Sequence, residues 1–454
     1  MSASLLIRHA EGMLTGLVGT AERRKGDIRI KDGRIAALGD LTPEPGERVL
    51  DATGCVIYPG LVSTHHHLFQ SVLKGISPGI DLPLEGWLRS VPYTYWHRLD
   101  RDALEVSATI GMVELLLSGT TTVADHHYLF AKSYDFEPAE VLFDVAEKLG
   151  LRLVLCRGGS TTTRTFDDDR TVPMPTETLD GMLKRVETLA QRFNDTAPDA
   201  MRRIVFAPTT PPWSLKVDEL KPAAQAARAM GLRLHSHLSE TQHYVKYCRE
   251  VYDMKPVHWV AEHDWLGEDV WFAHLVHMDP DEIALLSQTR TGMAHCPQSN
   301  CRLGSGIAPG PAFVAAGGRI SLAVDGAASN EAADMISEMH CAWMVHRAAH
   351  GAGAVRAEEV VRWATAGGAD VLDLPAIGSI EIGKTADLAI FDLHHPRYAG
   401  LHDPLVGPVV AGGAADLRHV LVGGRVVVEN GTIPGLDLRD LSAKAATVVR
   451  RLAA

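Results

Sequence analysis

Apolar and polar residues alternate near both ends of the chain. Residues 27–38 alternate around a Lys-Asp-Gly turn, which is typical of a β-hairpin. The same alternation, interrupted by glycines, returns in 378–392 and 418–431. The simplest interpretation is one composite domain, a small β-sandwich formed by both chain ends, 1–55 and 375–454.

The middle of the chain, 56–374, changes to apolar strand candidates that alternate with amphipathic helices. One helix is expected after Asp100, which can cap it, because apolar residues recur at helical spacing up to Leu117. Strands that alternate with helices pair in parallel, and eight such units predict a (β/α)8 TIM barrel. A doubly wound open sheet is the alternative topology. The expected strands lie at 56–65, 120–126, 151–159, 202–210, 232–240, 270–278, 291–299 and 319–327, and helices are expected at 176–193, 217–230, 241–262, 279–288 and 309–317.

Composition and net charge limit the kinds of molecule that the chain can bind. The chain has 454 residues, 46% of them apolar, so it can bury a large core. Its net charge of −12, without a basic run, argues against nucleic acid and anionic membranes as partners. No apolar run approaches the roughly 20 residues that span a bilayer. The start lacks the features of a signal peptide and the six cysteines are scattered, so we expect a cytoplasmic protein with reduced thiols.

Histidines and carboxylates stand where the predicted strands end. Chemistry in a (β/α)8 barrel sits at the carboxyl ends of the strands. Because side chains alternate along a strand, His65 and His67 face the same side and can coordinate one metal ion, whereas His66 is turned away. The fifth strand ends with His237 and a nearby Glu240. The sixth strand carries His274, and the last ends at Asp325.

Each of these residues also has a plainer interpretation. A single histidine at a strand end is usually a polar residue that has found a hydrogen-bond partner, and a His-rich segment can bind metal adventitiously. The ordered set of His-x-His, His-x-x-Glu, a further His and a final Asp is much harder to obtain by coincidence. Imidazoles with a carboxylate and an open position form hydrolytic zinc or iron(II) sites. The pattern therefore favours a metal-dependent hydrolase over a non-catalytic barrel scaffold.

The chain resembles the amidohydrolase superfamily along its whole length. PGLVSTHHHLFQ is similar to that family's first metal motif, and HSHLSE to its fifth-strand motif. The resemblance implies one divalent metal per chain, zinc or iron, held by His65, His67, His237 and Asp325. It makes Glu240 the acid/base, with His274 and Asp325 as the other catalytic residues. The fourth strand has no Lys, which implies the mononuclear branch of deaminases and triazine hydrolases.

Within that branch, VADHHYLF, AHCPQSN and VDGAASNEAADMISE look most like the isoxanthopterin (pterin) deaminases and 8-oxoguanine deaminases. The resemblance implies hydrolytic release of ammonia from a 2-amino-4-oxo bicyclic heterocycle, a small-molecule substrate. Guanine and a hydroxydechloroatrazine-type triazine are alternative substrates. We also expect a homo-oligomer.

Three residues are predicted to line the substrate pocket. Gln70 can offer an amide to the heterocycle, Arg157 can hold a carbonyl oxygen, and Trp213 can stack on the ring. The alternatives are that Arg157 only binds loop carbonyls and that Trp213 belongs to the core. The polar segment 160–175 is expected to form a long loop at the functional end of the barrel.

Overall fold

The computed structural model describes residues 4–414 and 416–454, and at its centre is the expected barrel. Eight parallel strands pair in chain order from β8 to β15. A bridge between His66 and Asp325 joins the first strand to the segment that follows the last. This closure confirms the (β/α)8 barrel over the open sheet. The strands are β8 (Leu61–His66), β9 (Thr120–His127), β10 (Arg152–Arg157), β11 (Arg202–Phe206), β12 (Leu234–Leu238), β13 (Val270–His274), β14 (Gly292–His295) and β15 (Arg319–Leu322).

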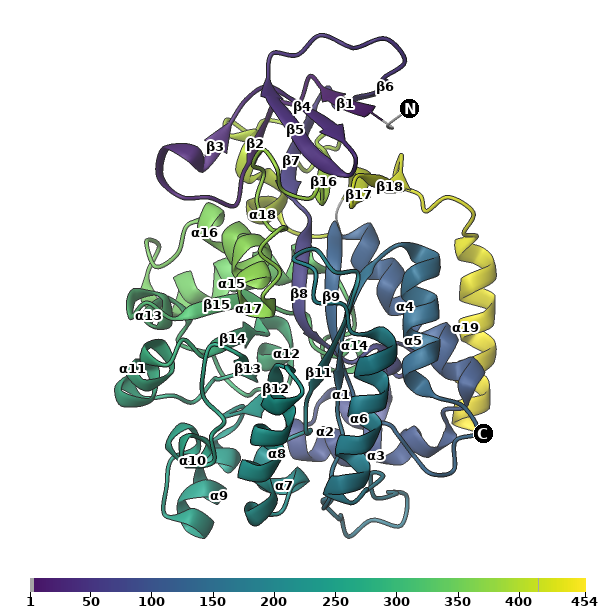
Figure 1. The fold of residues 1–454 in the computed structure, drawn as a ribbon, viewed down its shortest axis with the longest axis vertical. Coiled ribbons are helices and arrows are strands. Elements are labelled where there is room, and N and C mark those ends of the chain that lie inside the picture. Colours follow the sequence, from purple (N-terminus) through teal and green to yellow (C-terminus); the bar gives the residue numbers. More distant parts are fainter. Residues whose placement is uncertain (1–3, 415) are drawn as a thin grey trace.

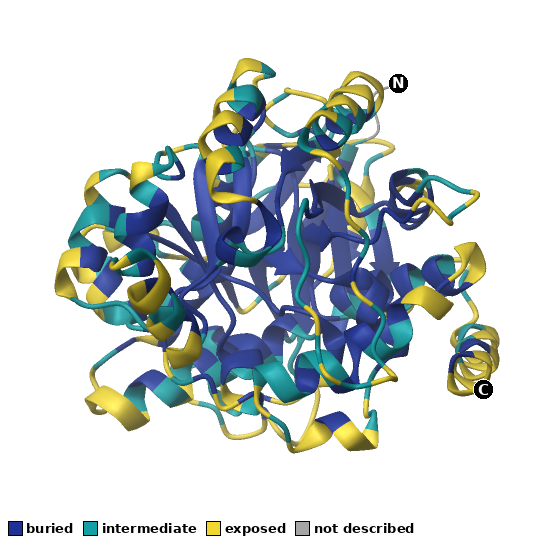
Figure 2. Cartoon of the chain, turned by 90° about the horizontal axis from the view of Figure 1, so that it is seen from below, coloured by how far each residue is buried: buried dark blue, intermediate teal, exposed yellow. Residues whose placement is uncertain are grey.

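Helices surround the barrel, and their exposed faces point outward (Figures 1 and 2). The Asp100 side chain accepts a hydrogen bond from the Ala103 amide and so caps the first long helix, as expected. The helices that surround the barrel are α4 (Arg101–Leu117), α5 (Pro138–Leu149), α6 (Leu179–Phe193), α8 (Val217–Ala229), α9 (Gln242–Tyr252), α10 (Pro256–Glu262), α11 (Pro280–Gln288), α13 (Gly310–Ala315), α15 (Met335–His350), α16 (Ala357–Arg362), α17 (Gly368–Leu372) and α19 (Leu438–Ala453). Short helices near the strand ends are α1 (Ser77–Ile80), α2 (Leu84–Ser90), α3 (Pro92–Tyr95), α7 (Pro211–Ser214), α12 (Pro297–Arg302) and α14 (Ala327–Asn330).

Two further sheets lie at one end of the barrel and use strands from both ends of the chain (Figure 1). The turn at Asp32 and Gly33, with φ of 50° and 76°, makes the predicted hairpin. Ile28 and Ile30 of one sheet share an apolar core with residues of the other, such as Leu388, which makes the pair a sandwich. One sheet has the order β5 (Arg34–Gly39), β4 (Asp27–Lys31), β1 (Ser4–Arg8), β6 (Arg48–Asp51); the other has β18 (Arg425–Glu429), β17 (Leu417–Val422), β16 (Leu388–Asp392), β7 (Cys55–Pro59), β2 (Gly12–Leu14), β3 (Arg23–Arg24).

Two predicted elements are each divided in the structure. The strand expected at 56–65 splits at Gly60, so that β7 joins an end sheet and β8 joins the barrel. The side chain of Thr121 fills the space where a Cβ on Gly60 would lie, which explains a glycine there. The helix expected at 241–262 breaks into α9 and α10. Asp253 has a φ of 53° at the break, and Pro256 starts the new helix.

The last helix, α19, returns to the barrel and lies along α4 (Figure 1). Val448 and Leu452 are buried in the main core, and Arg451 Nη2 is 2.8 Å from Asp100 Oδ1.

The division into a composite domain, 1–55 with 375–454, and a barrel domain, 56–374, stays a prediction.

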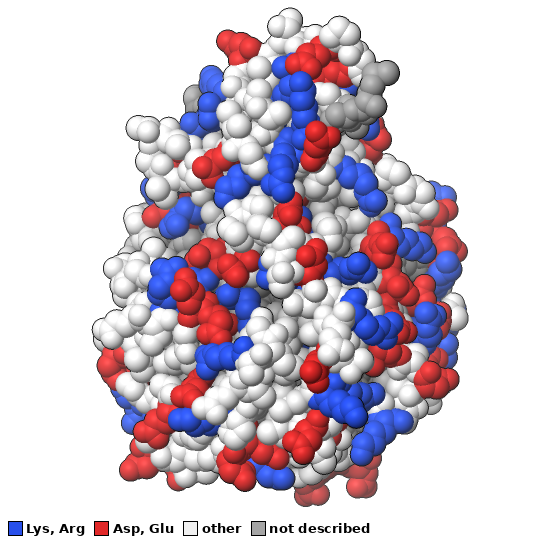
Figure 3. Space-filling view, viewed as in Figure 1, with Lys and Arg blue, Asp and Glu red and all other residues white. Residues whose placement is uncertain are grey.

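Charges of both signs are interspersed on the face drawn in Figure 3. In the part of the chain that the structure describes, no helix has the length and apolar character needed to cross a bilayer.

Candidate metal centre and substrate pocket

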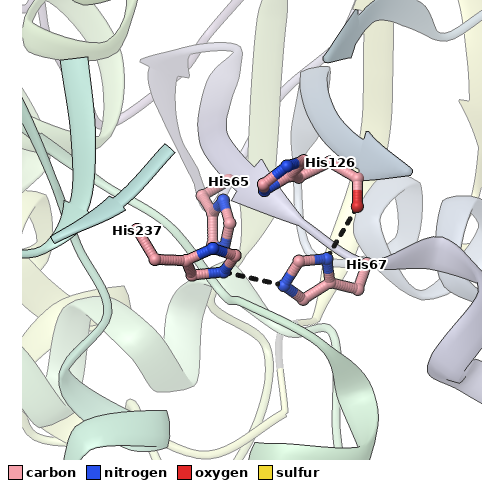
Figure 4. Close-up of side chains that lie close together, drawn as sticks. All are labelled: His65, His67, His126 and His237. Carbon is pink, nitrogen blue, oxygen red and sulfur yellow. Dashed lines mark hydrogen bonds between the residues drawn. The ribbon is translucent and has the colours of Figure 1, made fainter. Parts of the chain in front are cut away.

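Four of the predicted ligands meet inside the barrel at the carboxyl ends of its strands. His65 is the penultimate residue of β8, His67 follows the strand, and His237 lies in β12 (Figure 4). The Nε2 atoms of His67 and His237 are 3.2 Å apart. Asp325 Oδ1 is 3.2 Å from His65 Nε2 and 3.3 Å from His67 Nε2. His65, His67 and Asp325 are buried and His237 is half-buried, and the predicted ligand set forms one compact cluster.

Hydrogen bonds to carbonyl oxygens show which nitrogen of each imidazole carries the proton. His67 Nδ1 donates to the His126 carbonyl at 2.8 Å, and His237 Nδ1 donates to the Thr209 carbonyl at 2.5 Å. Because burial lowers the pKa of both rings, they are neutral. A neutral imidazole has one N–H, so both Nε2 atoms present lone pairs to the cluster.

The imidazole of His65 is oriented through a second histidine, His235. His235 Nδ1 donates to the Trp271 carbonyl at 3.0 Å, which leaves His235 Nε2 as an acceptor. His65 Nδ1 lies 2.8 Å from that acceptor and donates to it. His65 Nε2 therefore also presents a lone pair, and it has no hydrogen-bond partner among the described residues. Three lone pairs beside a carboxylate repel one another unless a cation lies between them.

The spacing of these atoms suits a divalent metal. Ligand atoms about 2.0–2.1 Å from a tetrahedral zinc are roughly 3.3–3.4 Å from each other. The distances of 3.2–3.3 Å between the Nε2 atoms and Asp325 Oδ1 agree with that geometry. Two overlapping groups of metal-binding side chains occur in the described part of the chain, and they add His126 and His274 to the same cluster. The residues present thus fit a divalent metal ion.

Both carboxylate oxygens of Asp325 make contacts. Oδ1 faces the imidazoles, and Oδ2 accepts hydrogen bonds from Ser299 Oγ at 2.6 Å and Ser329 Oγ at 3.0 Å. Burial alone would raise its pKa, but the contact with His65 and the other imidazoles outweighs burial and holds the pKa well below the ordinary value. Asp325 has a φ of 60°, a strained conformation that is common at functional sites.

Glu240 and His274 lie beside the cluster. His274 Nε2 is 3.7 Å from Glu240 Oε2, and His274 Nδ1 is 3.0 Å from the Asn300 side-chain oxygen. Burial raises the pKa of Glu240 to about 7, against the opposing effect of His274. A carboxyl group with such a pKa can give or take a proton near neutral pH.

A pocket lies next to this cluster and is lined in part by α2, α3, α7 and α9, which lie at the end of the barrel opposite the end sheets (Figure 1). Tyr128, whose ring centroid is 5.3 Å from that of His67, lines its inner part. Thr209, which orients His237, and Thr241, which follows Glu240, also line it. The outer wall comes from α2, α3, the loop 160–175, α7 and α9. The position of this loop agrees with its expected place at the functional end of the barrel.

The three predicted pocket residues have different surroundings. Gln70 is buried next to the cluster, and its amide occupies the space where a Cβ on Gly326 would lie. Trp213 lines the outer pocket. The guanidinium of Arg157 is paired with Glu177 at 2.6 Å and stacks on Phe130, away from the residues that line the pocket.

The comparison with known families agrees with this geometry. A model of the amidohydrolase family matches residues 56–427. The chain belongs to the amidohydrolase family. The predicted membership is thereby confirmed, as is the predicted enzyme class, a hydrolase that acts on carbon–nitrogen bonds.

Individual amidohydrolases match almost the full chain. An isoxanthopterin deaminase from an unknown prokaryotic organism is 48% identical over 99% of this chain and 97% of its own length. An 8-oxoguanine deaminase from Pseudomonas aeruginosa is 38% identical over 92% and 93%, respectively. The zinc complex of an atrazine chlorohydrolase from Arthrobacter aurescens superposes with a TM-score of 0.90 at 28% identity, and covers 98% of this chain and 100% of that one.

Several residues around the amidohydrolase site were not predicted individually. Ser299 and Asn300 orient Asp325 and His274, and both lie in the AHCPQSN segment that carries the family resemblance. Arg164 and Tyr244 line the outer pocket. They lie in an irregular loop and on a helix whose place beside the barrel opening has no local signal in the sequence.

Proposed function

We propose that this amidohydrolase is a hydrolytic deaminase of a 2-amino-4-oxo bicyclic heterocycle, isoxanthopterin or a related pterin, and that it releases ammonia. The observation that carries the proposal is the convergence of three imidazole lone pairs and the Asp325 carboxylate beside Glu240, a carboxyl group with a pKa of about 7. The full-length similarity to an isoxanthopterin deaminase supports the choice of substrate.

One divalent ion, zinc or iron, would be held by His65, His67, His237 and Asp325. The segment 202–210 contains no lysine that could bridge a second ion, which supports a single-metal site. When bound, such an ion lowers the pKa of a water molecule toward neutrality and makes it a better nucleophile.

The side chains around the cluster would move the protons. Glu240 donates its proton to the ring nitrogen beside the amino-bearing carbon, which makes that carbon electrophilic. Asp325 accepts a proton from the attacking water. His274, oriented by Asn300, hydrogen-bonds the oxygen that the substrate gains and stabilises its developing charge. Asp325 then passes its proton to the amine, which leaves as ammonia, and the new hydroxyl group returns a proton to Glu240 as the carbon becomes a carbonyl.

The pocket would select the heterocycle by its polar edge. Gln70, buried beside Asp325, is proposed to bind the ring edge through its amide. Trp213 is proposed to form part of the flat outer wall. Arg157 could reach a substrate only if its pair with Glu177 were broken. The predicted homo-oligomeric state and the predicted cytoplasmic location stay predictions.

The substrate is tested by kcat/KM for ammonia release from isoxanthopterin, 8-oxoguanine, guanine, cytosine and adenine on metal-replete enzyme. Buried polar groups reject analogues that leave them unpaired, so adenine and monocyclic cytosine should be poor substrates. A preference for 8-oxoguanine would select the second candidate, which the 38% identical relative supports. A preference for cytosine, adenine or a triazine would contradict the proposed substrate class.

A further inference from the structure

Arg164 holds a free guanidinium at the outer end of the pocket. It lies in the loop 160–175 and lines the pocket together with Trp213 and Tyr244. Its Cζ is 3.6 Å from the centroid of the Trp213 ring, so the guanidinium lies flat on the indole. Trp213 thus supports Arg164 with one face.

The charge of this guanidinium is not neutralised by a close carboxylate. Among residues 4–414 and 416–454, no ion pair or side-chain hydrogen bond of Arg164 is found. Burial lowers its pKa, while Tyr93 and the more distant charges of Glu85 and Glu240 act in the opposite direction. Arg157 provides the contrast, because its guanidinium is occupied by Glu177.

A second polar group on the same wall also lacks a partner. The Tyr244 side chain is almost completely buried and lines the pocket, and its hydroxyl has no hydrogen-bond partner in the described part of the chain. Buried hydroxyl groups are normally satisfied, so an unpaired one on a pocket wall indicates a ligand contact. Its ring centroid is 4.9 Å from that of Trp213, which places it beside the Arg164 stack.

We propose that Arg164, assisted by the Tyr244 hydroxyl, binds an oxygen on the substrate ring that lies farther from the reacting amino group. This inference rests on the proposed function. Tyr128 and Thr209, which lie next to His67 and His237, line the end of the pocket beside the metal centre, and Arg164 and Trp213 line its outer wall. A substrate whose amino-bearing carbon lies at the inner end therefore turns its second ring toward Arg164.

The proposal names a feature of the substrate. A guanidinium is a pure hydrogen-bond donor, and it suits a carbonyl or anionic oxygen. Isoxanthopterin carries such a carbonyl on its second ring, whereas pterin is the same bicycle without it. The same difference separates 8-oxoguanine from guanine. The enzyme should therefore select bicycles that bear an oxygen on the second ring.

The test compares two substrates on two variants. Arg164→Met should lower kcat/KM for isoxanthopterin by roughly 10- to 100-fold, the range for losing a hydrogen bond to a charged group. The value for pterin should change by less than about threefold, since pterin lacks the oxygen, and most of the loss for isoxanthopterin should appear in KM. Arg170→Met is the matched control, because Arg170 is exposed in the same loop and pairs with Asp168, and it should change neither substrate.

Arg164→Lys and Tyr244→Phe provide variants that disturb the loop less. Both should lower the isoxanthopterin-to-pterin ratio, by less than Arg164→Met. Equal losses on both substrates in all three variants, or a wild-type enzyme that prefers pterin, would overturn the role of Arg164. Failure of the proposed function looks different: metal-replete wild-type enzyme would then release no ammonia from any of these bicycles.

Discussion

The metal centre and the outer pocket wall are built in different ways. His65 and His237 come from barrel strands and have their Nδ1 atoms fixed by hydrogen bonds to His235 and to a backbone carbonyl. Arg164 and Trp213 come from a loop and a short helix, and both are half-buried. The difference indicates that the barrel fixes the chemistry, whereas the connecting segments choose the substrate.

Removal of a ligand should produce the largest effect and should not depend on the substrate. His237→Ala deletes one of the three converging lone pairs, so the protein should lose its metal. Activity should fall by more than the roughly 10–100-fold that loss of an outer partner costs. Elemental analysis and turnover measure both effects. His277→Ala is the control, because His277 bonds the Ser305 carbonyl outside the cluster and should keep the metal. Full metal content in His237→Ala would contradict the ligand assignment.

Glu240→Gln should separate proton transfer from metal binding. The amide keeps the shape of the side chain but cannot donate a carboxyl proton, so turnover should fall at least about 10²-fold on every substrate. Metal content should stay that of wild type. Glu250→Gln on the exposed side of α9 is the matched control. Normal turnover in Glu240→Gln would show that another group acts as the acid.

Ser299→Ala tests whether the hydrogen bond from α12 to Asp325 contributes to metal affinity. The change removes the 2.6 Å hydrogen bond to Asp325 Oδ2 and should weaken metal binding by about tenfold, the lower range for an outer partner. Competition with a chelator measures the affinity. Ser305→Ala is the control, because its hydroxyl has no partner in the described structure. Unchanged affinity in Ser299→Ala would mean that Asp325 does not need this contact.

The pH dependence of kcat/KM should be the smallest of these effects, with a decline of about tenfold per pH unit. Burial raises the pKa of Glu240 to about 7, so the carboxyl is protonated below that pH and ionised above it. Because the protonated form donates to the substrate, kcat/KM should fall as the pH rises above about 7. The residual activity of Glu240→Gln should lack this decline. An activity that stays level up to pH 9 would contradict the assigned role.

The centre could be predicted from sequence because strand periodicity decides which side chains face one another. His65 and His67 are two residues apart at the end of a strand, and barrel closure brings Asp325, which follows the last barrel strand, beside them. The pocket wall could not be predicted in this way. From the sequence, Arg157 was predicted to line the pocket and Arg164 was not. The course of the loop, which brings Glu177 to Arg157 and Arg164 to the pocket, depends on contacts that are distant in sequence.

The alternating segments predicted the sandwich formed by both chain ends. They did not predict that the chain passes from one sheet to another at Gly60. Within 56–65 the Pro59-Gly60 dipeptide indicates a break in the strand, but it does not indicate that the two halves join different sheets. The division depends on the close approach of Thr121 and on pairing with β16, which are contacts distant in sequence.

Metal stoichiometry tests the central claim most directly. Purified protein should contain one equivalent of a divalent metal per chain, and anomalous diffraction should place it among the Nε2 atoms of His65, His67 and His237 and the Asp325 carboxylate. Turnover should rise in proportion to occupancy. Two equivalents with a bridged pair of ions, or full turnover by protein free of metal, would contradict the account.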